Sequence, residues 1–241
     1  IKIQDEYNEW MIGKINNMNN NILYLGNYAG AGKSYSSCIG FNKNEVLFVC
    51  PFNKQSIELK NDGYDSITIN KFFNKGINDE QNIGQYEIPE NIKIIIFDEI
   101  LLNNLFMLMN IKKFIYTNKD IYKIIANGHI NQLQPINFGC NNINNINDYR
   151  YKCVEDMFDF KIILKEIKRL KSDEDKKIMI EMTKDIFNNL DIIDICKKYN
   201  ISMITDYKDI KTKNNICLFN FRCNQINKLI HKKEIINNNF I

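Results

Sequence analysis

The segment from residue 22 to residue 34 constrains the fold of this chain more than any other. It reads ILYLGNYAGAGKS, an apolar run followed by three glycines and then by Lys33 and Ser34. Glycines allow a backbone to wrap closely around an anion, so that consecutive N–H groups point at phosphate oxygens. A buried strand that enters such a loop, with a helix after it, is the context that a phosphate-binding loop requires. We therefore predict a strand, a phosphate-binding loop and a helix, in that order.

The residue types in this loop suit the chemistry of a nucleotide. Lys33 would place a positive charge at the β- and γ-phosphates, the Ser34 hydroxyl would ligate Mg²⁺, and the start of the helix would add partial positive charge. The full motif has glycine at position 27, where this chain has Asn27; Asn tolerates positive φ, so we expect the loop to form. Tyr28 and Tyr35 flank the loop and could cover the base or sugar, although helix packing explains Tyr35 equally well. The candidate nucleotide-binding residues are Asn27, Tyr28, Ala29, Gly30, Ala31, Gly32, Lys33, Ser34 and Tyr35.

Short apolar runs alternate with longer mixed segments along the chain. Such alternation, with nearly continuous apolar strands, favours an α/β fold in which helices cover both faces of a mostly parallel sheet. In such sheets, ligands bind at the carboxyl ends of the strands. Residues 141–149 have the composition of a polar loop. We predict strands at 22–25, 46–50, 66–69, 93–97 and 122–126, and helices at 5–19, 33–41, 53–60, 101–115 and 172–189.

The composition argues against several functional classes. The net charge is only +3, so any groove for nucleic acid has to be local. Seven cysteines form no C-x-x-C pair and only two histidines are present, which disfavours a zinc site and favours a reduced, intracellular protein, in the nucleus or at a cytoplasmic replication site. Neither a signal peptide nor a membrane span is expected, because charged and polar residues interrupt residues 1–9 and 92–109.

An acidic pair ends the most apolar predicted strand. Asp98 and Glu99 follow the run Ile94–Phe97. A carboxylate at this position can hold Mg²⁺ opposite a phosphate loop, and a second carboxylate beside it can orient and deprotonate an attacking water. Farther along the chain, the segment 128–135 contains Gln132, which could position water near a γ-phosphate; a turn that ends in proline explains that segment nearly as well.

In their order along the chain, these segments resemble the motifs of superfamily 1 DNA helicases, in particular the Pif1/RecD-like branch. The first motif is matched by residues 27–34, the Asp-Glu motif by 97–100, and a Gln-containing motif by 128–135, where His129 stands in place of an aspartate. Residues 49–54 and 66–73 resemble segments that contact single strands. Residues 164–169 resemble the segment that delivers an arginine to the γ-phosphate, and residues 217–220 resemble the opening strand of a second motor domain.

The resemblance implies a RecA-like ATP-binding domain at 1–150, a linking helical segment with the arginine motif at 151–214, and the truncated start of a second RecA-like domain at 215–241. It also implies ATP and Mg²⁺ as cofactors, and Gln4 as an adenine-reading residue. Arg169 has a second interpretation, as a surface member of the charged run 165–178. The predicted catalytic residues are Lys33, Glu99, Gln132 and Arg169, and the predicted magnesium ligands are Ser34 and Asp98.

The same resemblance implies single-stranded DNA, or RNA, as a partner, and replication or repair as the process. Aromatic faces stack on bases at about 1–3 kcal/mol each without reading sequence. Base stacking and core packing both explain Phe52 and Phe72, whereas core packing is the preferred explanation of Phe73. The predicted nucleic-acid contacts are Pro51, Phe52, Asn53, Thr68, Asn70 and Phe72.

Three functions are therefore compatible with the sequence. The first is an ATP-driven helicase or translocase motor. The second is a P-loop NTPase that has no role with nucleic acid, which would share the phosphate loop and the acidic pair. The third is a module that binds nucleotide or a replication partner without catalysis. Asn27, His129 and the missing second-domain motifs motivate the third. The response of ATP hydrolysis to single strands separates the first two, and steady hydrolysis excludes the third.

Overall fold

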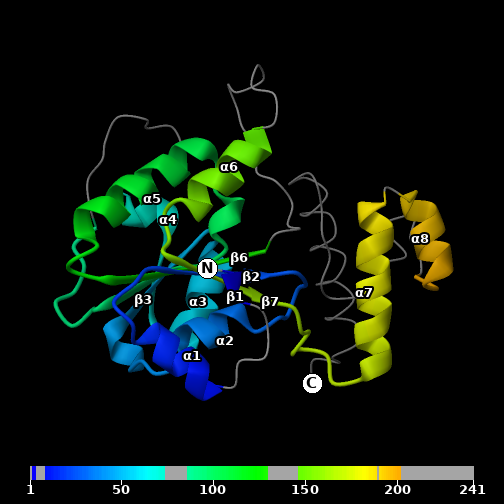
Figure 1. The fold of residues 1–241 in the computed structure, drawn as a ribbon, viewed down its shortest axis with the longest axis horizontal. Coiled ribbons are helices and arrows are strands. Elements are labelled where there is room, and N and C mark those ends of the chain that lie inside the picture. Colours follow the sequence, from blue (N-terminus) through cyan, green and yellow to red (C-terminus); the bar gives the residue numbers. More distant parts are fainter. Residues whose placement is uncertain (1, 4–8, 74–85, 130–145, 189, 202–241) are drawn as a thin grey trace, which may run out of the picture. The chain divides into compact units, whose positions relative to one another are not determined.

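The structure, a computed structural model, describes residues 2–3, 9–73, 86–129, 146–188 and 190–201 (Figure 1). The chain divides into two compact units, Ile1–Lys176 and Lys177–Ile241. Several predicted features lie outside the described residues: Gln4, Gln132, and the start of a second RecA-like domain at 215–241 with its opening strand at 217–220.

The first unit is built on a parallel sheet. The described residues form seven strands in the order β1-β7-β2-β6-β5-β3-β4, and every pairing between neighbours is parallel. This arrangement confirms the predicted α/β class. The strands are β1 (Lys2–Ile3), β2 (Ile22–Gly26), β3 (Val46–Cys50), β4 (Asp65–Thr68), β5 (Ile94–Phe97), β6 (Lys123–His129) and β7 (Phe160–Leu164).

Helices cover both faces of this sheet (Figure 1). One face carries α1 (Glu9–Asn16), α2 (Lys33–Cys38) and α3 (Asn53–Asn61). The other carries α4 (Ile69–Phe72), α5 (Leu105–Asn118) and α6 (Ile146–Glu155). Two short 3-10 turns, η1 (Lys43–Glu45) and η2 (Ile100–Leu102), precede β3 and follow β5.

The strands β2, β3 and β5 are apolar at nearly every position because both of their faces are buried. In β3, Leu47 and Val49 pack in the core beneath α4 and α5, whereas Val46, Phe48 and Cys50 pack in the opposite core. Successive side chains point to opposite faces of a strand, so each strand contributes to both cores. The near-continuous apolar runs in the sequence follow from this arrangement.

Several predicted boundaries were wrong, for local reasons. The predicted strand 66–69 ends one residue early, because Ile69 begins α4. The predicted helix 101–115 is interrupted, since the Asn104 side chain accepts a hydrogen bond from the N–H of Met107 and caps a new helix, α5. Residues 146–149, predicted as a loop, form the start of α6.

The sheet also extends past the domain boundary that the sequence predicts at residue 150. Strand β7, which the sequence analysis missed, pairs with β2 over its whole length from Phe160 to Leu164. It therefore lies in the first unit, which reaches Lys176. The segment that follows β7 starts at the same edge of the sheet as the phosphate loop.

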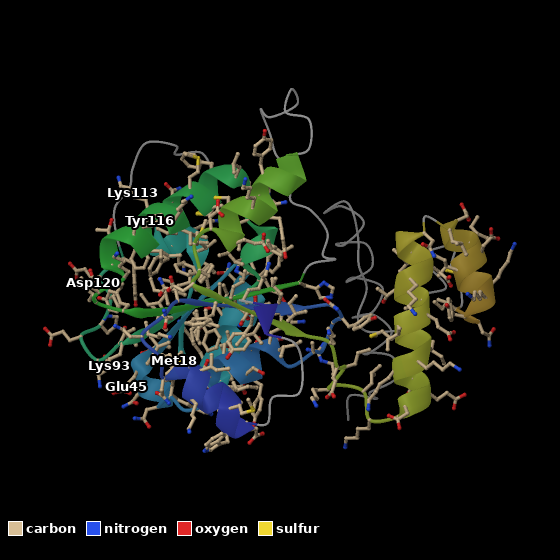
Figure 2. The ribbon with its side chains drawn as sticks, viewed as in Figure 1. Met18, Glu45, Lys93, Lys113, Tyr116 and Asp120 are labelled. Carbon is tan, nitrogen blue, oxygen red and sulfur yellow. The ribbon has the colours of Figure 1, made fainter. Side chains whose placement is uncertain are left out.

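The amino ends of the strands are held by polar contacts. Lys93 pairs with Glu45, and the two side chains lie near each other in Figure 2. The backbone of Lys93 also donates to the carbonyl of Glu45 at 2.9 Å. Lys123 donates to the carbonyl of Met18 at 2.5 Å. These contacts close the end of the sheet that is opposite the candidate site.

In the second unit, the described residues form most of α7 (Asp173–Phe187), which begins in the first unit, and α8 (Ile192–Lys198). Asp185 of α7 accepts hydrogen bonds from Lys198 and from the Tyr199 hydroxyl, both at 2.6 Å. The two helices are therefore tied together by one carboxylate. Among the described helices, none combines the length and the hydropathy needed to cross a bilayer.

Candidate nucleotide-binding site

The predicted phosphate loop connects the end of β2 to the start of α2. Gly30 and Gly32 have φ of 77° and 83°, a conformation that favours glycine. Asn27 is not among the residues with positive φ, so its tolerance of that conformation is not needed. Its backbone N–H instead donates to the carbonyl of Leu164 at 3.2 Å. The loop thus forms with Asn27 in the place of the first glycine of the motif.

Lys33 and Glu99 face each other across the loop. The Lys33 ammonium is buried, and its Nζ lies 3.9 Å from Oε1 of Glu99. Glu99 has φ of 49°, in the left-handed region that few non-glycine residues adopt. Backbone strain of this kind is typical of functional sites. The turn at Glu99 brings the second carboxylate of the acidic pair to the lysine of the phosphate loop.

Asp98 lies at the centre of a hydrogen-bond network. Its Oδ2 accepts from Nε2 of Gln55 at 2.6 Å and from Oγ of Ser34 at 3.4 Å. Its Oδ1 accepts from Nδ2 of Asn127 at 3.0 Å and from the N–H of Glu99 at 3.2 Å. The network joins β5, α2, α3 and β6, and it fixes the orientation of the carboxylate.

Burial dominates the electrostatics of Asp98, whose exposed fraction is 3%. Loss of solvation raises the pKa of this carboxyl, while the hydrogen bond from Asn127 and the charge of Lys33 act in the opposite direction. The negative charge is therefore costly in the protein alone, and a bound cation would offset that cost. Oxygen atoms of one carboxylate and one hydroxyl are ligands that Mg²⁺ prefers, so Ser34 and Asp98 fit this ion.

Arg169 lies against the phosphate loop. The carbonyl of Gly30 accepts hydrogen bonds from the N–H groups of Lys168 and Arg169, at 2.9 and 3.1 Å. A Cβ added to Gly30 would lie 2.6 Å from the Cβ of Arg169. The exposed Arg169 side chain thus starts beside the loop, which favours the phosphate interpretation over that of an unrelated surface charge.

His129 ends β6 and lies beside Gly26 in the sheet. Burial and the charge of Lys33 lower the pKa of His129. A neutral imidazole is therefore expected at neutral pH, and it supplies no negative charge near the loop. His129 therefore occupies the position of the aspartate in the helicase motif without supplying its negative charge.

The other loop residues differ in exposure. Tyr35 is 63% exposed on α2, and its hydroxyl donates to Oε1 of Glu9 at 2.6 Å. This bond links α1 to α2, although the Tyr35 ring itself is exposed rather than packed. Ala31 is buried, Ala29 is exposed and Tyr28 is half-buried.

The predicted nucleic-acid contacts follow two neighbouring strands, β3 and β4. Phe52 is 59% exposed and Asn53 is also exposed, directly after β3. After β4, Asn70 is exposed, whereas Thr68, like Pro51, is half-buried.

Phe72 does not belong to this set. It is 2% exposed, and its ring packs edge-on against Phe73, Phe97 and Phe114. Core packing is therefore the correct interpretation of Phe72, as it is of Phe73, because neither ring can reach a base.

Sequence reasoning missed two amides in the site, Gln55 and Asn127. Asn127 is fully buried in β6, and its place directly after the apolar run at 124–126 is a usable signal. Gln55 stands in the first turn of a polar helix and gives no such signal. Its contact with Asp98 joins residues that are 43 positions apart, and only the sheet brings them together.

Comparison with known proteins shows the fold. No family model matches this chain, and no curated protein sequence matches it. Solved structures do match. A Pif1 helicase from Bacteroides in complex with ADP-AlF3 and ssDNA has a TM-score of 0.58 and 16% identity, over 97% of this chain and 57% of that one. The Pif1 helicase from Candida albicans has a TM-score of 0.60 and 16% identity, over 94% of this chain and 54% of that helicase. Bacteroides Pif1 bound to ssDNA has a TM-score of 0.54 and 17% identity, over 91% of this chain and 54% of that helicase.

The chain thus spans little more than half the length of these helicases. At such low identity, the similarity concerns the fold. It confirms the predicted RecA-like P-loop architecture and, at the level of fold, the resemblance to Pif1 helicases that the motifs predict.

Proposed function

We propose that this chain is the ATP-dependent motor part of a DNA helicase or translocase. One observation carries the proposal: the ends of β2 and β5 bring Lys33, Ser34, Asp98 and Glu99 together, and Arg169 borders the same loop. These are the residues needed for phosphoryl transfer, which depends on positioning and on neutralisation of charge. The fold shared with Pif1 helicases supports the proposal.

Each side chain has a task in ATP hydrolysis. The backbone of residues 27–32 would bind the phosphates, and Lys33 would neutralise charge at the β- and γ-phosphates. Ser34 and Asp98 would hold Mg²⁺, which supplies charge neutralisation when it is bound. Glu99, which Lys33 keeps oriented at 3.9 Å, would place the attacking water and accept its proton. Gln132 is proposed to help position that water.

Arg169 would act on the γ-phosphate. An arginine in this role is worth roughly 10³–10⁵ in rate. The hydrogen bonds from residues 168 and 169 to Gly30 support the proposal, since they keep the arginine segment next to the phosphate loop.

We further propose that single-stranded nucleic acid binds across the ends of β3 and β4. Phe52 offers an exposed ring for stacking, and Asn53 and Asn70 offer polar groups. Contacts to the backbone of the strand would make binding weaker at high salt. The Pif1 structures bound to ssDNA support this proposal by analogy of fold.

The test is ATP hydrolysis with and without oligo-dT, in the wild type and in Lys33→Ala. We expect oligo-dT to raise the rate in the wild type, and Lys33→Ala to abolish hydrolysis while the melting temperature is retained. Lys113→Ala is the matched control, because Lys113 is exposed on α5 (Figure 2). Hydrolysis without any response to oligo-dT at low salt would favour an NTPase that has no role with nucleic acid. Activity retained in Lys33→Ala would refute the assigned site.

A further inference from the structure

The hydrogen bond from Gln55 to Asp98 has no role in the mechanism proposed above. It is the shortest bond to this carboxylate, at 2.6 Å, and it reaches Oδ2, the oxygen that also faces Ser34. The other amide, Asn127, binds Oδ1 from β6. The two oxygens of Asp98 are thus held by two different parts of the fold. The oxygen toward the phosphate loop depends on α3.

The proposed nucleic-acid loop, residues 51–53, runs directly into α3, whose first residue is Asn53. Phe52 occupies the N-cap position of α3, and its carbonyl accepts the N–H of Ser56 at 3.2 Å. Gln55 is the third residue of the helix. It lies in the same turn as the exposed Phe52 and Asn53, so a displacement of that loop changes the position of the Gln55 backbone.

The next residue of α3 is anchored to the sheet. The Ser56 hydroxyl lies 2.8 Å from the Ser66 hydroxyl of β4, and the Ser66 hydroxyl donates to the carbonyl of Ser56 at 2.5 Å. Both serines are buried. We therefore expect any movement of the loop to be limited to the first turn of α3, because Ser56 is hydrogen-bonded to β4.

We propose that Gln55 is a positioning residue through which single-stranded nucleic acid on the 51–53 loop controls the metal-binding oxygen of Asp98. The inference rests on the proposed function of the site. Without nucleic acid, Gln55 holds Oδ2 and competes with a cation for that oxygen. When a strand binds Phe52 and Asn53, the first turn of α3 shifts and Gln55 releases Oδ2. The carboxylate then becomes a better ligand for Mg²⁺, and the bond between Gln55 and Asp98 couples the two sites.

The test measures binding rather than turnover. A fluorescent, non-hydrolysable ATP analogue is titrated with Mg²⁺, with and without oligo-dT, in the wild type and in Gln55→Met. Met keeps the length and the helix propensity of Gln but removes the amide donor. Lys60→Ala, in the exposed last turn of the same helix, is the control.

In the wild type and in Lys60→Ala, we expect oligo-dT to lower the Mg²⁺ concentration for half-maximal binding about fivefold, the lower end of typical coupling between sites. Gln55→Met should already have the low midpoint without oligo-dT and should show no further shift.

Two results would overturn the inference alone: a wild type that binds both labelled oligo-dT and the analogue with Mg²⁺ but shows no shift of the Mg²⁺ midpoint, or a shift of the same size in Gln55→Met. Failure of the wild type to bind labelled oligo-dT, or to bind the analogue in a Mg²⁺-dependent way, would instead refute the proposed function, and the inference with it.

Discussion

At Gly30, the backbone has no room for a side chain. Its φ is positive, and an added Cβ would lie 2.6 Å from the Cβ of Arg169. Gly30→Ala should therefore combine backbone strain with a steric clash, and should lower the free energy of unfolding by about 2–4 kcal/mol. Gly63→Ala is the control, because Gly63 also has positive φ, 87°, but its nearest neighbour would be a lysine side-chain carbon at 3.8 Å. Gly63→Ala should lower the free energy of unfolding by only about 1–2 kcal/mol. Urea denaturation measures the free energy of unfolding of both variants. Equal losses would contradict the predicted steric clash at Gly30.

Asp98 illustrates how a residue of the candidate site can reduce stability. Since burial raises the pKa of this carboxyl above its ordinary value of 3.8, the protonated form is favoured in the folded state. The folded protein then loses stability as the pH rises above about 4, where the unfolded chain releases the proton more readily.

Asp98→Asn should therefore raise the melting temperature of the metal-free protein at pH 7 by a few degrees. Each 1 kcal/mol of added unfolding free energy corresponds to about 2–4 °C. The gain should shrink as the pH falls toward 4, because both side chains are then neutral. The same variant should lose Mg²⁺-dependent nucleotide binding. Thermal melting across pH tests this, and a lower melting temperature at pH 7 would contradict it.

At the scale of elements, Arg150 connects α6 by hydrogen bonds to the turn that follows the acidic pair. This arginine is 1% exposed, and it donates to the carbonyls of Leu101 and Asn103, the latter at 2.9 and 3.1 Å. Both carbonyls lie within four residues of Glu99. Without Arg150, two buried acceptors would lose a charged donor, at about 1–3 kcal/mol each.

Arg150→Leu should accordingly lower the free energy of unfolding by about 2–4 kcal/mol. It should also weaken nucleotide binding, because the turn after Glu99 loses its support. Lys152→Leu makes the same kind of change at an exposed position of the same helix and should have little effect. Chemical denaturation compares the two, and similar losses in both variants would show that Arg150 has no special role.

The central elements of the sheet could be predicted from sequence because both of their faces are buried. The strand at 46–50 was predicted with its observed bounds. Strand β7 was missed because Lys161 interrupts its apolar run and a charged segment follows it. The break in the predicted helix at 101–115 was also missed. It arises because the Asn104 side chain caps a new helix at this point, and such a local side-chain bond competes with continuation of the helix.

The candidate site was predictable where its residues are adjacent in sequence. Lys33 and Ser34 belong to one motif, and so do Asp98 and Glu99. The partners that orient Asp98 were not predictable in the same way, because Gln55 reaches it only through the order of β3 and β5 in the sheet. Phe72 could not be separated from Phe52 by residue type, and only burial shows that one is core and the other surface.

At the scale of the whole molecule, the parallel sheet explains why dispersed motifs form one site. All described strands run in the same direction, so the carboxyl ends of β2, β5, β6 and β7 lie at one edge. The segments after β3 and β4 emerge at the same edge and carry the proposed nucleic-acid contacts. Nucleotide and single strand would thus bind along one edge of the first unit.

The most direct test of this account is the binding of ATP and Mg²⁺ to the wild type, Lys33→Ala and Lys113→Ala, measured by titration calorimetry. The account predicts Mg²⁺-dependent binding in the wild type, unchanged affinity in Lys113→Ala, and a loss of at least tenfold in Lys33→Ala, equivalent to about 1.4 kcal/mol. Equal affinity in the wild type and in Lys33→Ala would contradict the assignment of this edge of the sheet as a nucleotide site.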